Sequence, residues 1–197
     1  GATVIKLCRF ALEYSLTGLE FAFGIPGSVG GAIYMNAGAY GGEIGDYVVA
    51  VNHIDYDGNR GSWSPRQAGF SYRHSNYMDN DLIVTSVVLQ LDKANPEAIK
   101  MKMDNFMERR KAKQPLEYGS AGSTFKRPEG YFAGALIEQS GLKGKQIGGA
   151  QVSEKHAGFV INKDNATAKD VIELMAFIRE TVQKDHGVTL EPEVRIL

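Results

Sequence analysis

Residues 24–31 read Gly-Ile-Pro-Gly-Ser-Val-Gly-Gly, and a second glycine cluster follows closely at residues 35–42, Met-Asn-Ala-Gly-Ala-Tyr-Gly-Gly. Glycine adopts positive φ easily and lets backbone N–H groups approach a phosphate. The spacing matches neither a phosphate loop ending in Lys-Ser/Thr nor the G-x-G-x-x-G dinucleotide fingerprint. A tight turn would explain the first cluster alone, but the second cluster favours a backbone that lines a ligand.

The rest of the chain alternates between helical and strand patterns. Alternation and turn residues predict strands over residues 47–56, 82–91, 159–161 and 188–197, with Asp57-Gly58 as a hairpin turn. Helical spacing predicts helices over residues 4–12, from Asn95-Pro96 to about 111, over 131–140, and from Thr167 to Gly187. Thr167 and Asp170 resemble a capping box there. Residues 114–128 are expected to form a loop. This order predicts an α+β or mixed α/β fold.

Composition excludes several classes of function. The 197 residues carry 22 Lys and Arg against 23 Asp and Glu, which gives no basic excess for nucleic acid or an anionic membrane surface. No apolar run approaches the roughly 20 residues of a membrane span. Cys8 is the only cysteine, so we expect no internal disulfide and a reducing, cytoplasmic location. The four histidines show no metal-ligand spacing, and we expect no metal site.

Three polar residues stand out as candidates for chemistry. The Arg73 guanidinium could hold a carboxylate in a bidentate contact and stabilise an enolate, although a surface arginine is the commoner case. Ser123 lies among small residues but lacks the elbow of a hydrolase nucleophile, so a turn serine is the better explanation when it is taken alone. Glu193 shares a strand face with Glu191 and Arg195, and a solvated edge with Glu–Arg pairing is the commoner case for such a pattern.

Taken together, several sequence blocks resemble the UDP-N-acetylenolpyruvoylglucosamine reductase (MurB) family, a family of bacterial cell-wall flavoenzymes. The blocks occur in the family's order and cover essentially the whole chain. The interval between Arg73 and Ser123 resembles the shorter, type II-like form. The blocks are residues 24–31 with 36–41, 72–75 (Tyr-Arg-His-Ser), 121–128 (Ala-Gly-Ser-Thr-Phe-Lys-Arg-Pro), 148–156 (Gly-Gly-Ala-Gln-Val-Ser-Glu-Lys-His) and 190–195 (Leu-Glu-Pro-Glu-Val-Arg).

The resemblance implies the C-terminal part of a two-subdomain FAD-binding fold of the PCMH/VAO-like type, plus an α+β substrate-binding domain. The second FAD-binding subdomain is expected at residues 1–112 with 188–197, and the substrate domain at residues 113–187. The family's first FAD-binding subdomain, with its pyrophosphate-gripping loop, is expected to be absent, which would truncate the enzyme at its N-terminus.

The family's chemistry gives each candidate a role. NADPH reduces FAD, and flavin N5 then passes hydride to the β-carbon of UDP-N-acetylglucosamine enolpyruvate, giving UDP-N-acetylmuramate for peptidoglycan precursors. Arg73 and Glu193 would stabilise the enolate electrostatically. Ser123 would protonate the α-carbon with help from Glu193, whose pKa a water-poor site would raise. The resemblance thus implies an oxidoreductase of cell-wall biogenesis, linked to cell shape, cell cycle and division, and we expect a monomer.

The resemblance also assigns binding residues. Tyr72 would pack beside Arg73 at the substrate, while Lys113 and Arg127 would contact the UDP diphosphate. Backbone groups of the two glycine clusters would line the flavin. These flavin-lining residues are Gly24, Pro26, Gly27, Ser28, Gly30, Gly31, Asn36, Ala37, Gly38 and Tyr40.

Two other functions remain open from the sequence. Another flavin oxidoreductase of the same fold could oxidise an alcohol or sugar with oxygen, but the set of Arg73, Ser123 and Glu193 suits reduction of an enolpyruvyl acid better. A non-catalytic module that binds a nucleotide sugar is the alternative from a different class. Sugar-nucleotide binding without flavin binding would favour that module.

Overall fold

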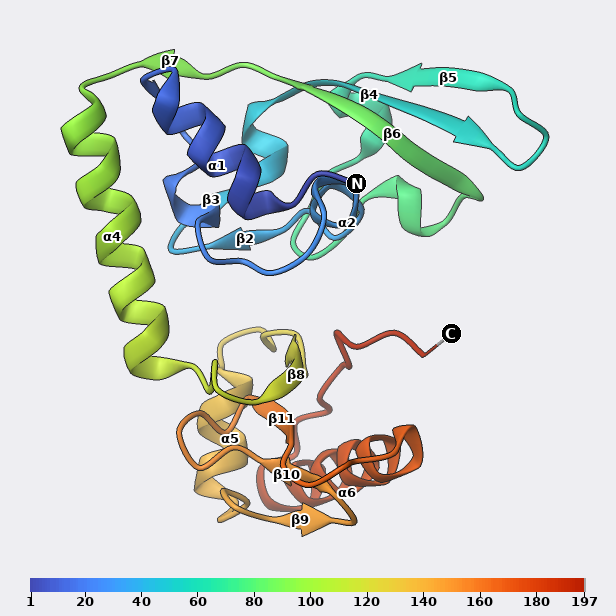
Figure 1. Ribbon diagram of the computed structural model, residues 1–197. Helices are drawn as coiled ribbons and strands as arrows, with labels where there is room; N and C mark the ends of the chain where they lie inside the picture. Colours follow the sequence, from blue (N-terminus) through green and yellow to red (C-terminus); the bar gives the residue numbers. More distant parts are fainter. Residues whose placement is uncertain (197) are drawn as a thin grey trace. The chain divides into compact units, whose positions relative to one another are not determined.

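The computed structural model describes residues 1–196, which divide into two compact units (Figure 1). The first unit is Gly1–Arg109, and the second begins at Arg110. Each unit combines helices with antiparallel strands and has its own hydrophobic core. The mixture of helix and sheet confirms the α+β class.

The first unit is built around a three-stranded sheet with strand order β5-β4-β6. The helix α2 packs against β6, where a Cβ built on Gly30 would lie 3.7 Å from the Val84 Cβ. The elements are α1 (Val4–Glu13), β1 (Leu16–Thr17), α2 (Val29–Tyr34), β2 (Gly38–Ala39), β3 (Gly42–Glu43), β4 (Val48–Asp55), β5 (Arg60–Trp63), α3 (Pro65–Ala68), β6 (Leu82–Leu89), β7 (Asp92–Lys93) and α4 (Pro96–Lys113), which ends in the second unit. Short 3-10 helices cover Glu20–Ala22, Ile44–Tyr47 and Asn76–Met78.

Local sequence signals position these elements as expected. The predicted hairpin is present between β4 and β5, and Asp55 accepts hydrogen bonds from Asp57 and Asn59 across its turn. Helix α4 begins at Pro96, as the Asn-Pro pair predicts. The core of the unit includes the fully buried Ile33 of α2 and Val51 of β4. This core supports the loops that follow α2 and precede β6.

The second unit is built around a four-stranded antiparallel sheet with strand order β8-β11-β10-β9. Helix α6 has the predicted capping box, in which Thr167 and Asp170 exchange side-chain-to-backbone hydrogen bonds, and it ends at Gly187 in the left-handed conformation. The apolar face of α6 packs into the core through Leu174, Ile178 and others. The elements are β8 (Gly119–Ser123), α5 (Ala133–Gln139), β9 (Gln146–Ile147), β10 (Ala150–Val152), β11 (Phe159–Asn162) and α6 (Ala168–His186).

The second unit differs from the sequence prediction in two places. The expected loop over residues 114–128 contains the strand β8, and the expected closing strand over residues 188–197 is absent from its described part, residues 188–196. Pro192 instead forms an isolated bridge with Phe125. Backbone groups of residues 190–193 make hydrogen bonds within this unit, and the closing segment belongs to the same compact unit as residues 110–187, whereas we expected it with the first 112 residues.

Candidate functional site

The first glycine cluster forms a loop that leads into α2. Backbone hydrogen bonds fix the loop to the start of α1: Val4 donates to the carbonyl of Gly27 at 3.1 Å, and Val29 donates to that of Ala2 at 2.8 Å. Ser28 caps α2 by accepting a hydrogen bond from the Gly31 amide at 3.0 Å. Pro26, Gly27 and Ser28 are exposed. The loop therefore has a fixed backbone with its tip open to solvent.

Asn36, which is only 1% exposed, holds the second glycine cluster in place through its side-chain hydrogen bonds. Its side-chain Nδ2 donates to Oε2 of Glu43 at 2.7 Å and to the carbonyl of Ser71 at 2.8 Å. Its Oδ1 accepts from the Gly45 amide at 3.0 Å. Asn36 thus joins the β2–β3 hairpin to the turn around residue 71.

Arg73 lies at the tip of that turn. Ser71 and His74 exchange two backbone hydrogen bonds of 3.1 Å, and Arg73 between them has a φ of 52°. This left-handed conformation costs a residue with a Cβ about 1–2 kcal/mol, so the surrounding structure must hold it. The guanidinium Nη2 donates to the carbonyl of Gly38 at 2.8 Å, and its carbon lies 5.1 Å from the ring centre of Tyr72.

Tyr40 is the second aromatic residue of this region and also has a left-handed φ, of 53°. Its ring stacks on Phe106 of α4 with centroids 4.6 Å apart and planes 7° apart. The guanidinium carbon of Arg109 lies 4.4 Å from the Tyr40 ring centre. Tyr40 therefore fixes the tip of the hairpin to α4 within the first unit.

In the second unit, a β-bulge precedes Ser123. Ser123 pairs with Phe159 and Ser120 pairs with Ile161, so β8 holds one more residue than β11 in this interval. The bulge contains Gly122 at a φ of 88°. As a result Ser123 is exposed while the adjacent Thr124 is 2% exposed. The Ser123 hydroxyl donates to the carbonyl of Phe125 at 3.2 Å.

Glu193 lies on the segment that pairs with residues after β8. Its amide donates to the carbonyl of Thr124 at 2.9 Å, and the Lys126 amide donates to the carbonyl of Glu191 at 2.9 Å. Lys126 and Glu191 also form a salt bridge of 2.6 Å. The fold therefore places the backbones of Ser123 and Glu193, far apart in sequence, on neighbouring segments of one unit.

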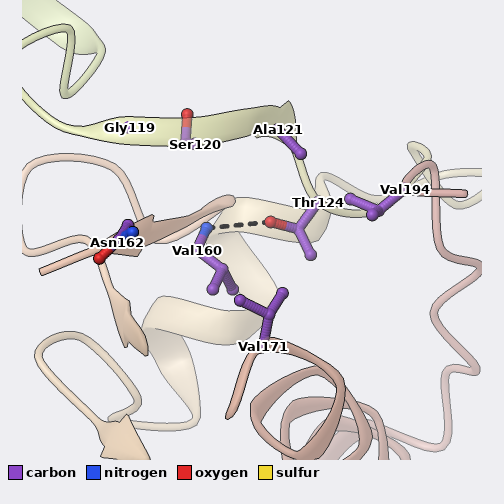
Figure 2. Close-up of a pocket in the computed structure, with 8 residues that line it drawn as sticks. All are labelled: Gly119, Ser120, Ala121, Thr124, Val160, Asn162, Val171 and Val194. Carbon is purple, nitrogen blue, oxygen red and sulfur yellow. Dashed lines mark hydrogen bonds between the residues drawn. The ribbon is translucent and has the colours of Figure 1, made fainter. Parts of the chain in front are cut away.

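A pocket of about 240 Å³ lies beside these two segments, within the second unit (Figure 2). Thr124, the residue after Ser123, and Val194, the residue after Glu193, both line it. The Thr124 hydroxyl accepts a hydrogen bond of 2.9 Å from the Val160 amide at the pocket wall (Figure 2). The other lining residues are Gly119, Ser120, Ala121, Asn162 and Val171.

The two basic residues expected at the diphosphate are both exposed in the second unit. Lys113 is the last residue of α4. Arg127 donates from Nε to the carbonyl of Tyr131 at 3.2 Å, and its guanidinium carbon lies 4.0 Å from the ring centre of the exposed Phe132. A cation with an aromatic face beside it suits contact with an anionic, ring-containing ligand.

The structure thus groups the candidate residues by unit. The glycine loop, the Asn36–Tyr40 segment, Tyr72 and Arg73 belong to the first unit, and Lys113, Ser123, Arg127 and Glu193 to the second. The sequence did not single out Glu43, whose carboxylate accepts a hydrogen bond from the Asn36 side chain, because no sequence motif includes Glu43. Within residues 1–196, no three His, Cys, Asp or Glu side chains cluster as metal ligands, and no helix is long and apolar enough to cross a membrane.

Family models match both units. Residues 114–197 match the UDP-N-acetylenolpyruvoylglucosamine reductase C-terminal domain, and residues 1–60 match an FAD binding domain. The FAD-domain match covers both glycine clusters, which supports FAD as the cofactor of this part of the chain. The match at residues 114–197 includes Ser123 and Glu193.

Relatives and one solved structure match the chain over nearly its full length. The UDP-N-acetylenolpyruvoylglucosamine reductases of Thermotoga maritima and Syntrophomonas wolfei are 53% and 51% identical over all 197 residues, which span 69% and 66% of those proteins. The crystal structure of the reductase (MurB) from Thermus caldophilus matches with a TM-score of 0.86 and 38% identity, over 98% of this chain and 69% of that one. These matches confirm the resemblance seen in the sequence blocks, and the chain belongs to the UDP-N-acetylenolpyruvoylglucosamine reductase family.

Proposed function

We propose that the protein is an NADPH-dependent FAD enzyme that reduces UDP-N-acetylglucosamine enolpyruvate to UDP-N-acetylmuramate for peptidoglycan precursors. The observation that carries the proposal is the pairing of the Ser123 and Glu193 segments through the Glu193–Thr124 hydrogen bond, at 2.9 Å. It puts a hydroxyl-bearing and a carboxylate-bearing residue on neighbouring segments, so that Glu193 could assist proton donation by Ser123. The names of the relatives supply the substrate class.

The residues of the first unit fit a bound flavin. Gly27 and Gly41 both have positive φ, and a Cβ built on either would stand in open space with no atom within 4 Å. An exposed glycine backbone of this kind lets a phosphate or ring approach N–H groups closely. We propose that residues 24–31 and 36–40 line the flavin mainly with backbone groups. When bound and reduced by NADPH, FAD supplies the hydride that the enolpyruvyl β-carbon receives.

Arg73 has the chemistry to hold the substrate carboxylate. Its planar, positively charged guanidinium presents N–H donors in a fork that matches a carboxylate, and its Nη2 donates to the Gly38 carbonyl. As negative charge moves onto the carboxylate, a fixed cation stabilises the resulting enolate. The backbone strain at Arg73 supports this role, because strained residues concentrate where a side chain must be held in place.

Ser123 would deliver the proton to the α-carbon, which completes the reduction. Its hydroxyl donates to the Phe125 carbonyl, so delivery of the proton to the substrate requires that this hydrogen bond break. A serine is a weak acid in water, and we assign Glu193 to support the hydroxyl through hydrogen bonding. Tyr72 would pack against the substrate beside Arg73, and Lys113 and Arg127 would contact the diphosphate.

Steady-state NADPH oxidation tests the proposal. The protein is supplied with FAD and assayed with and without UDP-N-acetylglucosamine enolpyruvate, with UDP-N-acetylglucosamine as the matched control. The expected result is oxidation that depends on the enolpyruvyl group and yields UDP-N-acetylmuramate. If the FAD-supplied protein binds the sugar nucleotide but never forms UDP-N-acetylmuramate, the reductase assignment is wrong and a role in binding sugar nucleotides replaces it.

A further inference from the structure

The side chain of Asn36 is committed to the protein interior. Its Nδ2 donates hydrogen bonds to the Glu43 carboxylate at 2.7 Å and to the Ser71 carbonyl at 2.8 Å. Its Oδ1 accepts a hydrogen bond from the Gly45 amide at 3.0 Å. With 1% of its surface exposed, it offers no side-chain contact to a ligand. Its left-handed φ of 43° suits asparagine, which tolerates this region better than most residues.

Arg73 makes a second link between the β2–β3 hairpin and the turn at residues 71–74. The Asn36 side chain links the start of the β2–β3 hairpin to Ser71, and the Arg73 guanidinium links the turn back to Gly38 of the same hairpin, at 2.8 Å. A Cβ on Gly38 would lie 2.8 Å from the Glu43 Cγ and 3.4 Å from Arg73 Nη1. Asn36, Glu43, Gly38 and Arg73 therefore form one closely packed network.

We propose that Asn36 is a positioning residue for Arg73: it fixes the 71–74 turn against the hairpin, so that the guanidinium is held in one orientation before substrate arrives. Glu43 of β3 also takes part in this positioning, because its carboxylate accepts a hydrogen bond from the Asn36 side-chain amide. The consequence for catalysis rests on the proposed function, in which Arg73 stabilises the enolate. The positioning itself rests only on the contacts of the first unit.

The variant Asn36→Gly tests the side-chain hydrogen bonds separately from the backbone conformation. Glycine adopts the left-handed φ without strain, so the variant loses the three hydrogen bonds and keeps the turn of the chain. Asn36→Asp is the conservative variant, because it keeps the acceptor for Gly45 but replaces the Nδ2 donor with a carboxylate oxygen beside Glu43. Thr17→Val is the matched control, since it removes a part-buried hydrogen bond to Glu20 in the same unit without touching this network.

The first readout is the side-chain NMR signal of Arg73 in protein labelled with ¹⁵N-arginine, assigned with Arg73→Lys. In the wild type the Nε–H signal is expected to be single and sharp. In Asn36→Gly and Asn36→Asp we expect it to move and broaden, while the Arg60 signal on β5 stays in place. An Arg73 signal that is unchanged in both Asn36 variants, or moves equally in Thr17→Val, overturns the proposal.

The second readout separates the two half-reactions of the flavin-loaded protein. Misplacing a catalytic group by an ångström costs on the order of 10²-fold in rate, so we expect a loss of that order in flavin reoxidation by the enolpyruvyl sugar. Flavin reduction by NADPH is expected to stay within about twofold of the wild type, because Arg73 has no part in it. Equal losses in both half-reactions, or a loss confined to FAD affinity, would make Asn36 a flavin-binding residue instead.

The two readouts distinguish failure of this proposal from failure of the proposed function. If the wild-type protein does not reduce the enolpyruvyl sugar at all, the reductase assignment fails, yet the NMR signal still decides whether Asn36 orients Arg73. If Asn36→Gly does not fold, Asn36→Asp decides it, because the aspartate has nearly the same shape. An active wild type with an unmoved Arg73 signal rejects the positioning role alone.

Discussion

Arg73 donates a hydrogen bond from Nη2 to the carbonyl oxygen of Gly38 at 2.8 Å, across 35 residues of sequence. This contact joins a strained turn to a glycine hairpin that the FAD-domain match covers. It gives the guanidinium a defined direction, which a flexible surface arginine lacks. Because electrostatic stabilisation of a transition state depends on groups that are oriented in advance, the contact makes Arg73 the strongest candidate for the enolate-stabilising cation.

Replacement of Arg73 should slow one half-reaction. Arg73→Lys keeps a positive charge but loses the fork of donors, so we expect flavin reoxidation by the enolpyruvyl sugar to fall by roughly 10²–10³-fold. Flavin reduction by NADPH should be unchanged within about twofold. Stopped-flow measurement of the two half-reactions checks this, with the exposed Arg66→Lys of α3 as a control. An effect on FAD binding alone would contradict the enolate role.

Removal of the Ser123 hydroxyl should affect proton delivery and weaken the fold only modestly. Ser123→Ala removes one hydrogen bond to the Phe125 carbonyl, so we expect a loss of about 0.5–1.5 kcal/mol in the free energy of unfolding. We expect reoxidation of the reduced flavin by substrate to slow by about 10²-fold or more, with flavin reduction by NADPH unchanged. Ser120→Ala on the same strand is the control. Normal rates in both half-reactions would remove Ser123 from the proton-donor role.

Thr124 should be important for stability. Its hydroxyl accepts from the Val160 amide at 2.9 Å in the sheet of the second unit, and valine has the same shape without the acceptor. Thr124→Val leaves the buried amide unpaired, so we expect a loss of about 1–3 kcal/mol in the free energy of unfolding. Urea unfolding measures it. Thr85→Val, at an exposed hydrogen bond, is the control and should lose less. Equal losses would mean that burial of the Val160 amide has no special cost.

His156 should make the second unit sensitive to acid. Burial lowers the pKa of its imidazole below the ordinary 6.5, and its Nδ1 accepts a hydrogen bond from the Gly158 amide at 3.1 Å. The unfolded chain then binds a proton at higher pH than the folded chain does. Stability from this group is therefore complete above about pH 7 and is lost as pH falls through the ordinary pKa of 6.5 towards the lowered folded pKa.

The matched variant for this test is His156→Gln. It cannot titrate, so the loss of stability that His156 causes below about pH 7 should be absent in the variant. The measurement is the urea midpoint of the second unit at several pH values. If wild type and variant lose stability in parallel over this range, protonation of His156 is not the cause.

Local sequence determined much of the secondary structure. The capping box at Thr167 and Asp170, the helix start at Pro96 and the hairpin turn at Asp57-Gly58 each depend on residues within a few positions of one another. Their hydrogen bonds form inside short segments, so the sequence contains the whole signal. The ordered blocks also identified the family. Each block is a short run of residues, and it can be recognised in the sequence without knowing what it contacts in the folded protein.

Only the tertiary structure decided the rest. The strand β8 was not predicted because Gly119–Ser123 consists of Gly, Ser and Ala, which are typical of loops, and its strand conformation depends on pairing with β11. The segment 188–196 carries a strand pattern, but its hydrogen bonds go to the bridge at Phe125 and to neighbouring loop residues. Asn36 is predicted to line the flavin through its backbone, and nothing near it in the sequence indicates that its side-chain amide contacts Ser71. Contacts between residues distant in the chain depend on how the core brings their segments together, and no local pattern contains that information.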